Sequence, residues 1–240
     1  MRRRPHLVLA LHGTRSAAGQ QVASDLMLAV ATRLPGVEVH LGWADVLTPT
    51  LTETLTGVGD AVVVPGFLTA GYHVTSDLPA AIQAAGGRAR LAGLIGPALG
   101  DAVADRLLSA GGPGDAVVLA AAGSKRPRSV AEVADAARQL SELVGRPVVA
   151  GFITAARPSV TDAVAQLRAL GHDRVSVASY LLAPGVFSER LHTVGADVVS
   201  DPIGVHPLVV EAVANAYAAV VAERRDVPGQ APGVGRERIA

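Results

Sequence analysis

Short apolar runs alternate with segments of helical spacing along the first half of the chain. Residues 7–11 are apolar and end in a polar loop, and apolar positions then return at helical spacing over residues 17–34. This order predicts a strand, a loop and a helix. The same reasoning predicts further strands at residues 37–43, 61–64 and 89–95, and further helices at residues 50–55, 79–85 and 100–108. Strands that alternate with helices predict an α/β fold with parallel sheets covered by helices.

The same pattern restarts after the Gly-Gly-Pro-Gly segment at residues 111–114, which is the most obvious linker. Strands are predicted at residues 115–120, 148–152 and 175–180, and helices at residues 129–144 and 207–222. The chain has 240 residues, so each copy has the usual size of a domain. We therefore predict two pseudo-symmetric lobes, residues 1–112 and 113–224. Pro, Gly and charged residues dominate residues 225–240, which we expect to form a disordered tail.

The two halves differ at three aligned positions, where only the first half has ionisable side chains. Leu-His-Gly-Thr-Arg at residues 11–15 aligns with Ala-Ala-Gly-Ser-Lys at residues 121–125. The three positions hold His12, Asp45 and His73 in the first half, and Ala122, Thr154 and Phe187 in the second. Residues that a duplicated fold needs for its structure should be present in both halves, whereas residues that carry out chemistry can be present in one half only. Each of the three residues follows a predicted strand end, where open α/β sheets bind ligands.

Two imidazoles and a carboxylate are a plausible ligand set for a metal ion. Neutral imidazole nitrogen suits divalent iron, cobalt and nickel, while a carboxylate adds negative charge and a proton acceptor. Three ligands leave coordination positions open, which suits catalysis or metal delivery more than structural closure. The other histidines lack support from the repeat, and we interpret them as surface or capping residues: His6, His40, His172, His192 and His206.

The composition excludes several classes of function. There is no cysteine, so disulfides, thiolate metal sites and a cysteine nucleophile are all excluded. Lys plus Arg and Asp plus Glu both number 21, which gives no overall field to attract nucleic acid or a membrane surface. The apolar run after the N-terminal arginines is too short for a signal peptide, and no segment approaches the roughly 20 apolar residues that span a bilayer. We expect a cytoplasmic protein with no nucleic-acid or membrane partner.

Three segments carry a specific family resemblance: Leu-His-Gly-Thr-Arg at residues 11–15, Trp-Ala-Asp at residues 43–45 followed by Thr-Pro-Thr-Leu, and residues 65–79 with Gly-Tyr-His at their centre. They resemble the signature segments of sirohydrochlorin chelatases, the class II chelatases of the sirohaem and cobalamin pathways. The likeness extends to about residue 222, as a two-lobed form with a degenerate second lobe and a cleft between the lobes. It implies a lyase that inserts cobalt or ferrous iron into sirohydrochlorin, with the metal as substrate and no organic cofactor.

The resemblance also implies roles for single residues. His12 and His73 would hold the incoming metal ion and help to take up the pyrrole protons, which requires groups with a pKa near neutrality. The acidic residue of the second motif, usually glutamate, corresponds to Asp45. Aspartate is about one methylene shorter, so this position departs from the family pattern. Ala70 also stands where a proline is common.

The carboxylates of sirohydrochlorin need cationic side chains or helix starts around the cleft. Thr14, Arg15 and Ser16 lie at a predicted helix start beside His12, and Lys125 and Arg126 occupy the equivalent loop of the second half. These five are candidate substrate-binding residues. The alternative is that the cations are solvated side chains flanking a helix. Since a two-lobed chain already supplies a pseudo-symmetric pair, we expect a monomer.

Two other functions remain open at this point. A non-catalytic tetrapyrrole or metal carrier would use the same cleft without a base. Phosphoryl transfer is suggested by a His-Gly pair after the first strand with an Arg nearby. Against it, Leu11 stands where histidine phosphatases have an arginine, and the chain lacks a Gly-x-x-x-x-Gly-Lys phosphate loop. The identity of the metal, and the choice between the sirohaem and cobalamin pathways, do not follow from these residues.

Overall fold

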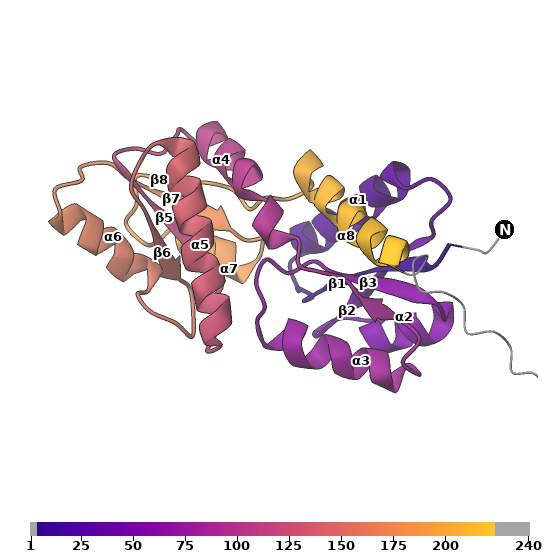
Figure 1. Ribbon diagram of the computed structural model, residues 1–240. Helices are drawn as coiled ribbons and strands as arrows, with labels where there is room; N and C mark the ends of the chain where they lie inside the picture. The colour runs from indigo at the N-terminus through magenta and orange to yellow at the C-terminus, as the bar shows by residue number, and fades with distance from the viewer. Residues whose placement is uncertain (1–3, 224–240) are drawn as a thin grey trace, which may run out of the picture.

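The computed structural model describes residues 4–223 and contains two parallel four-stranded sheets (Figure 1). The first sheet has the order β2-β1-β3-β4, with β1 (His6–Leu11), β2 (Val39–Trp43), β3 (Ala61–Pro65) and β4 (Arg90–Leu91). The second has the order β6-β5-β7-β8, with β5 (Ala116–Ala121), β6 (Val148–Phe152), β7 (Val175–Tyr180) and β8 (Val198–Val199). The two-lobed α/β fold expected from the sequence is thus confirmed.

Helices cover both faces of each sheet. They are α1 (Ala17–Arg33), α2 (Leu51–Val58), α3 (Leu78–Ala84), α4 (Gly100–Ser109), α5 (Pro127–Val144), α6 (Val160–Ala169), α7 (Val186–Leu191) and α8 (Pro207–Glu223). A π-helical turn, His73–Asp77, precedes α3, and a 3₁₀ turn, Gly96–Ala98, precedes α4. Side-chain caps fix several helix starts, as at α2, where Thr50 and Glu53 form a capping box. Helices α6 and α7 and strand β8 were not predicted from the sequence.

The two sheets have the same strand register. Leu11 at the end of β1 pairs with Trp43, and Ala121 at the end of β5 pairs with Phe152. His12 and Ala122 therefore follow equivalent strand ends. This equivalence confirms the alignment of the two halves on which the choice of candidate residues rests.

The closing helix of each half packs on the other half. Helix α4 contacts α5 and β7 of the second sheet, while α8 contacts α1 and β3 of the first (Figure 1). The Tyr217 hydroxyl of α8 donates to the carbonyl of Pro5 at 2.7 Å. This exchange of closing helices was not predicted, because helical periodicity locates a helix but does not specify which sheet its apolar face will cover. The boundary near residue 112 stays a prediction about the sequence repeat.

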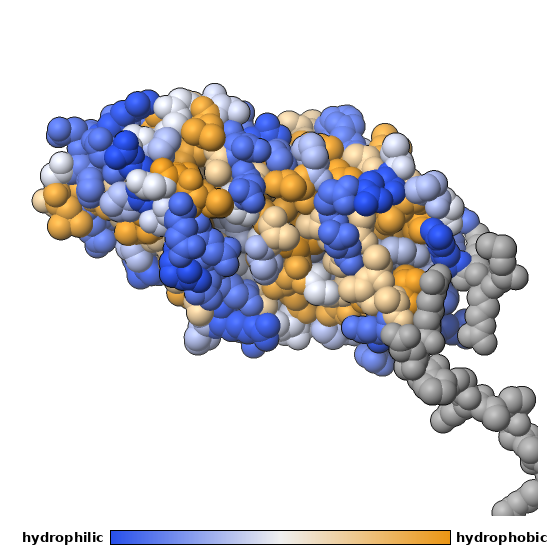
Figure 2. All heavy atoms as spheres, turned by 45° about the horizontal axis from the view of Figure 1, so that its top comes forward, coloured by the Kyte–Doolittle hydropathy of each residue, from blue (hydrophilic) through white to orange (hydrophobic). Residues whose placement is uncertain are grey.

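One hydrophobic core runs through both lobes as a result of this exchange. It includes Leu9 of β1, Leu107 of α4, Leu119 of β5 and Val213 of α8. Smaller cores lie under α2 and α3 on the first sheet and under α6 on the second. Apolar residues also reach the surface, where they are interspersed with hydrophilic residues (Figure 2). No helix within residues 4–223 is long and apolar enough to cross a membrane, and the expected tail at residues 225–240 lies outside the described residues.

Candidate functional site

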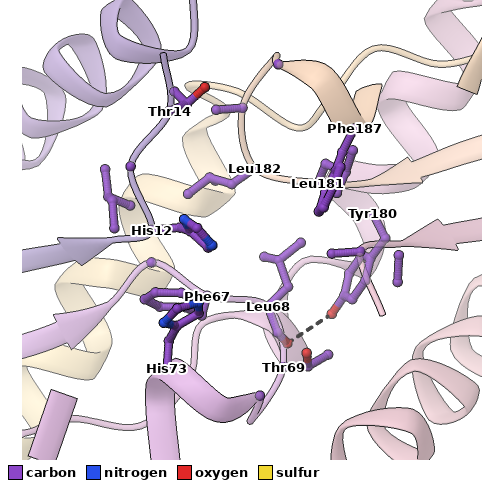
Figure 3. Close-up of a pocket in the computed structure, with 18 of the residues that line it drawn as sticks. His12, Thr14, Phe67, Leu68, Thr69, His73, Tyr180, Leu181, Leu182 and Phe187 are labelled. Atoms are coloured by element: carbon purple, nitrogen blue, oxygen red, sulfur yellow. Dashed lines mark hydrogen bonds between the residues drawn. The ribbon is translucent and has the colours of Figure 1, made fainter. Parts of the chain in front are cut away.

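A cavity of about 950 Å³ lies where the carboxyl ends of the two sheets face each other (Figure 3). The loops after β1 and β3 line it from the first lobe, and the loops after β5 and β7 line it from the second. Much of the wall is apolar, with Leu68, Leu181 and Leu182 among its residues. The volume is at the upper end of the range for small-molecule sites, so the cavity can admit a large ligand with apolar surface.

His12 and His73 meet at one wall of this cavity. His12 follows β1, and His73 opens the π-helical turn after β3. Their ring centroids are 4.5 Å apart and the ring planes are inclined by 71°. Both rings line the cavity (Figure 3). The structure therefore brings together the two histidines that the sequence singled out.

A carboxylate on the next helical turn orients one of these rings. The Nδ1 atom of His73 lies 2.6 Å from Oδ2 of Asp77, and the ring of Phe67 stacks on His73 with centroids 6.0 Å apart. A carboxylate at Nδ1 favours the tautomer that carries its proton there and leaves Nε2 with a free lone pair, as in many metal-binding histidines. Asp77 was not among the predicted site residues. Its spacing of four residues from His73 on a helical turn was the available signal.

Asp45 lies outside the cavity wall. Its side chain is exposed, and its Oδ1 atom accepts a hydrogen bond from the backbone N–H of Val46 at 2.7 Å. Its own amide donates to the carbonyl of His12 at 3.1 Å. The structure thus does not bring this carboxylate into the cavity with the two histidines. A short aspartate side chain bonds readily to nearby backbone, and here it helps to shape the loop behind His12.

A glycine fixes the turn after each first strand. Gly13 has φ of +96°, and a Cβ atom there would lie 2.2 Å from the carbonyl oxygen of Asp45. Gly123 has φ of +97° and the same kind of close approach to the carbonyl of Thr154. Both positions therefore require glycine. The second half keeps the backbone geometry of the histidine loop, although Ala122 replaces the imidazole.

The five predicted substrate-binding residues separate into two groups. Thr14, Lys125 and Arg126 line the cavity, whereas Arg15 and Ser16 do not. The Ser16 hydroxyl instead caps α1 by accepting from the N–H of Gly19 at 3.3 Å. Arg15 is exposed, as expected for the alternative in which this cation is a solvated side chain beside a helix start.

Arg126 spans the gap between the lobes. Its guanidinium lies over the ring of Tyr72, 5.6 Å from the ring centroid, and its NH2 group donates to the Ser76 hydroxyl at 3.2 Å. The start of α5 in the second lobe thus contacts the loop that carries His73. Such a cation, held at the cavity wall by an aromatic ring, can bind a carboxylate at little further entropic cost.

Polar side chains of α5 hold the loop between β3 and His73. The carboxylate of Glu132 accepts from the N–H of Ala70 at 2.6 Å, and the Ser129 hydroxyl donates to the hydroxyl of Thr69 at 2.9 Å. Tyr180 lines the cavity nearby, and burial, together with the charge of Glu132, raises the pKa of its phenol well above the usual range. Tyr180 therefore stays a neutral hydrogen-bond donor. Sequence patterns do not reveal these contacts, because they join residues from different lobes.

The wall opposite the two histidines carries no ionisable group at the aligned positions. Thr154 lines the cavity there, and its hydroxyl donates to the carbonyl of Ala122 at 2.9 Å. Phe187 occupies the position that aligns with His73, and its ring also lines the cavity (Figure 3). Among the residues that line the cavity, the imidazoles therefore come from the first lobe alone.

Comparison with known proteins gives consistent results. The model of the CbiX family matches residues 6–107 and 116–220. A sirohydrochlorin cobaltochelatase of Methanococcoides burtonii is 33% identical over 78 residues, and one of Methanosarcina acetivorans shows the same identity over the same length. These matches cover 30% of this chain and 60% of each relative, so the chain spans less than two thirds of the curated relatives it matches.

Two solved structures have the same fold over most of the chain. SirB from Bacillus subtilis with Fe³⁺ superposes with a TM-score of 0.79 and 23% identity, covering 93% of this chain and 98% of SirB. A CbiX described as the terminal enzyme for biosynthesis of sirohaem in denitrifying bacteria superposes with a TM-score of 0.68 and 23% identity, covering 90% and 99% of the two chains. At this level of identity the likeness establishes the fold.

Proposed function

Because the chain belongs to the CbiX family, we propose that it inserts a divalent metal ion into a sirohydrochlorin-type tetrapyrrole. The observation that carries this proposal is the pair of imidazoles, His12 and His73, at the wall of a cavity large enough for a macrocycle. Curated relatives that match about a third of the chain are named sirohydrochlorin cobaltochelatases, which supports the same reaction.

The two histidines would hold the incoming metal ion, which is a substrate of the reaction. Asp77 and Phe67 fix the ring of His73, so its Nε2 atom is preorganised as a ligand. His12 lies beside it with a more exposed ring. Two imidazoles leave most coordination positions free for water and then for pyrrole nitrogens, so the ion can be passed on to the macrocycle.

Insertion also requires two pyrrole nitrogens to lose their protons. A base on the same face as the metal is needed, with a pKa close to the working pH. We assign this role to His12 and His73 together, because both rings line the cavity wall and their centroids are 4.5 Å apart. Asp77 would hold the ring of His73 in one orientation for this role. Asp45 would act only indirectly, through the shape of the loop that carries His12.

The cavity would bind the faces and the peripheral carboxylates of the tetrapyrrole. The apolar side chains of Leu68, Leu181 and Leu182 suit the faces of the macrocycle, while Lys125 and Arg126 suit its carboxylates. Binding energy gained at these groups, far from the reacting nitrogens, can offset the cost of distorting the ring. Since both lobes of one chain form this cavity, we also propose that the protein acts as a monomer.

An anaerobic metallation assay tests the proposal. Purified protein, sirohydrochlorin and either Co²⁺ or Fe²⁺ are mixed, and insertion is followed by the absorbance of the macrocycle. We expect the His12→Ala and His73→Ala variants to metallate at least about 100-fold more slowly, while tetrapyrrole binding is retained. The surface variant His192→Ala serves as a matched control. Wild-type protein that binds sirohydrochlorin but accelerates insertion of neither metal would instead be a carrier.

A further inference from the structure

A second pair of histidines lies at the opposite end of β1. The Nδ1 atom of His6 is 3.0 Å from Nε2 of His40, and it is 3.6 Å from a carboxylate oxygen of Glu38. Within residues 4–223, this is the one group of three histidine or acidic side chains whose ligand atoms all lie within 4.8 Å of one another. The sequence had given no reason to separate His6 and His40 from the other surface histidines.

The backbone of the sheet places these three side chains on one face. Strands β1 and β2 are parallel, and Val8 pairs with His40, so His6 stands opposite Glu38. Because side chains alternate along a strand, residues 6, 38 and 40 point to the same side of the sheet. The N–H of Leu7 donates to the carbonyl of Glu38 at 2.9 Å, which ties the two strands together at this point.

The distances suit a shared metal ion. Two nitrogen ligands at about 2.1 Å from a metal ion lie about 3 to 3.4 Å apart in octahedral or tetrahedral geometry. The separation of 3.0 Å between the ring nitrogens falls within this range. The His6 side chain is 13% exposed and that of Glu38 is 56% exposed, so the imidazole is enclosed by the fold while the carboxylate lies at its surface.

We propose that His6, Glu38 and His40 bind a divalent first-row metal ion, such as Co²⁺ or Zn²⁺, at the amino ends of β1 and β2. Two imidazoles and one carboxylate form the ligand set, and water can fill the remaining positions. The ion cross-links the edge strand β2 to its neighbour. Strand β1 separates the site from His12 by about 20 Å, so it is distinct from the cavity.

Cobalt binding to an untagged full-length chain tests the proposal. The starting protein carries His12→Ala and His73→Ala, which removes the imidazoles of the cavity, and bound cobalt is measured by equilibrium dialysis and metal analysis. We expect this protein to retain about one ion per chain. Adding His40→Ala should abolish that binding, adding Glu38→Gln should weaken it, and adding His192→Ala should leave it unchanged.

Cobalt should also raise the melting temperature of the starting protein but not that of the protein with His40→Ala added. The proposal is overturned if the starting protein binds no more cobalt than that variant, or if Glu38→Gln binds it as tightly as the starting protein. Far-ultraviolet circular dichroism checks that each variant is folded, and Glu38→Gln provides the test if His40→Ala is not. None of these results depends on whether the cavity metallates a tetrapyrrole.

Discussion

The exchange of α4 and α8 predicts that the two lobes unfold together. Leu107 lies on α4, which belongs to the first half of the sequence but packs on the second sheet, and its side chain is 0% exposed. Truncating such a leucine to alanine leaves a cavity and typically costs about 2–5 kcal/mol of unfolding free energy. We therefore choose Leu107→Ala as the perturbation.

The chain has one tryptophan, Trp43, whose fluorescence reports on unfolding of the first lobe, whereas Leu107 packs on the second sheet. Trp43 is in β2 of the first sheet and is 8% exposed, so its fluorescence will change when the first lobe unfolds. With a urea dependence of about 2–3 kcal/mol per molar for a chain of this size, Leu107→Ala should lower the unfolding midpoint by about 1–2 M. Because both lobes share a core, we expect the same shift in Trp43 fluorescence and in far-ultraviolet circular dichroism.

The neighbouring Leu108 gives a matched control. Its side chain is 60% exposed on the same helix, so Leu108→Ala should change the unfolding free energy by no more than about 0.5 kcal/mol. The reasoning is refuted if Leu107→Ala produces an early transition in circular dichroism while the Trp43 transition stays at the wild-type midpoint. That result would mean that the lobes unfold separately despite the exchanged helices.

Three further predictions concern the cavity and the second lobe. Asp77→Asn should slow metallation by about 10- to 100-fold without changing tetrapyrrole affinity, since it removes the carboxylate that orients His73; metallation rates and a binding titration against Asp101→Asn would check this. Arg126→Ala should raise the KM for the tetrapyrrole by about 10-fold or more, whereas Arg15→Ala, outside the cavity wall, should leave it nearly unchanged. Asp197 accepts from the N–H of Val175 and pairs with Arg168, which holds the pKa of its carboxylate below the usual 3.8. A lowered folded-state pKa stabilises the fold fully above the unfolded pKa, so Asp197→Asn should lower the urea midpoint at pH 7. The difference should begin to shrink as the pH falls below 3.8 and should vanish only below the lowered folded-state pKa.

Sequence patterns predicted the inner strands of each sheet because their residues are continuously apolar. Residues 7–11 and 61–64 correspond to β1 and β3, both of which are buried almost throughout. His12 and His73 were identified for a different reason, namely that the second half lacks them. Comparison of the two halves thus separated side chains with a structural role from side chains available for chemistry.

Features that depend on contacts between lobes could not be predicted in this way. The exchange of α4 and α8 depends on which sheet an apolar helix face meets, and both sheets offer similar surfaces. The Asp45 carboxylate could have pointed into the cavity, but it accepts a hydrogen bond from the backbone N–H of the next residue instead. A sequence pattern does not show which of these two positions a short side chain takes. Asp77 contacts the ring of His73 and orients it, and this contact can be identified only from side-chain rotamers and distances.

The structure adds a fourth position, residue 77, to the three at which the two halves differ. Phe187 aligns with His73, and at the same spacing Leu191 aligns with Asp77. Leu191 is buried in the core under α6, so the second half lacks the orienting carboxylate as well as the imidazole. Restoring a histidine at position 187 alone would therefore not recreate a preorganised ligand, because nothing there would fix its tautomer. A metal ion delivered from the first lobe would meet an apolar and hydroxyl-bearing wall on the far side. If the cavity metallates a tetrapyrrole as proposed, the macrocycle would receive the ion, and release its protons, on one face only.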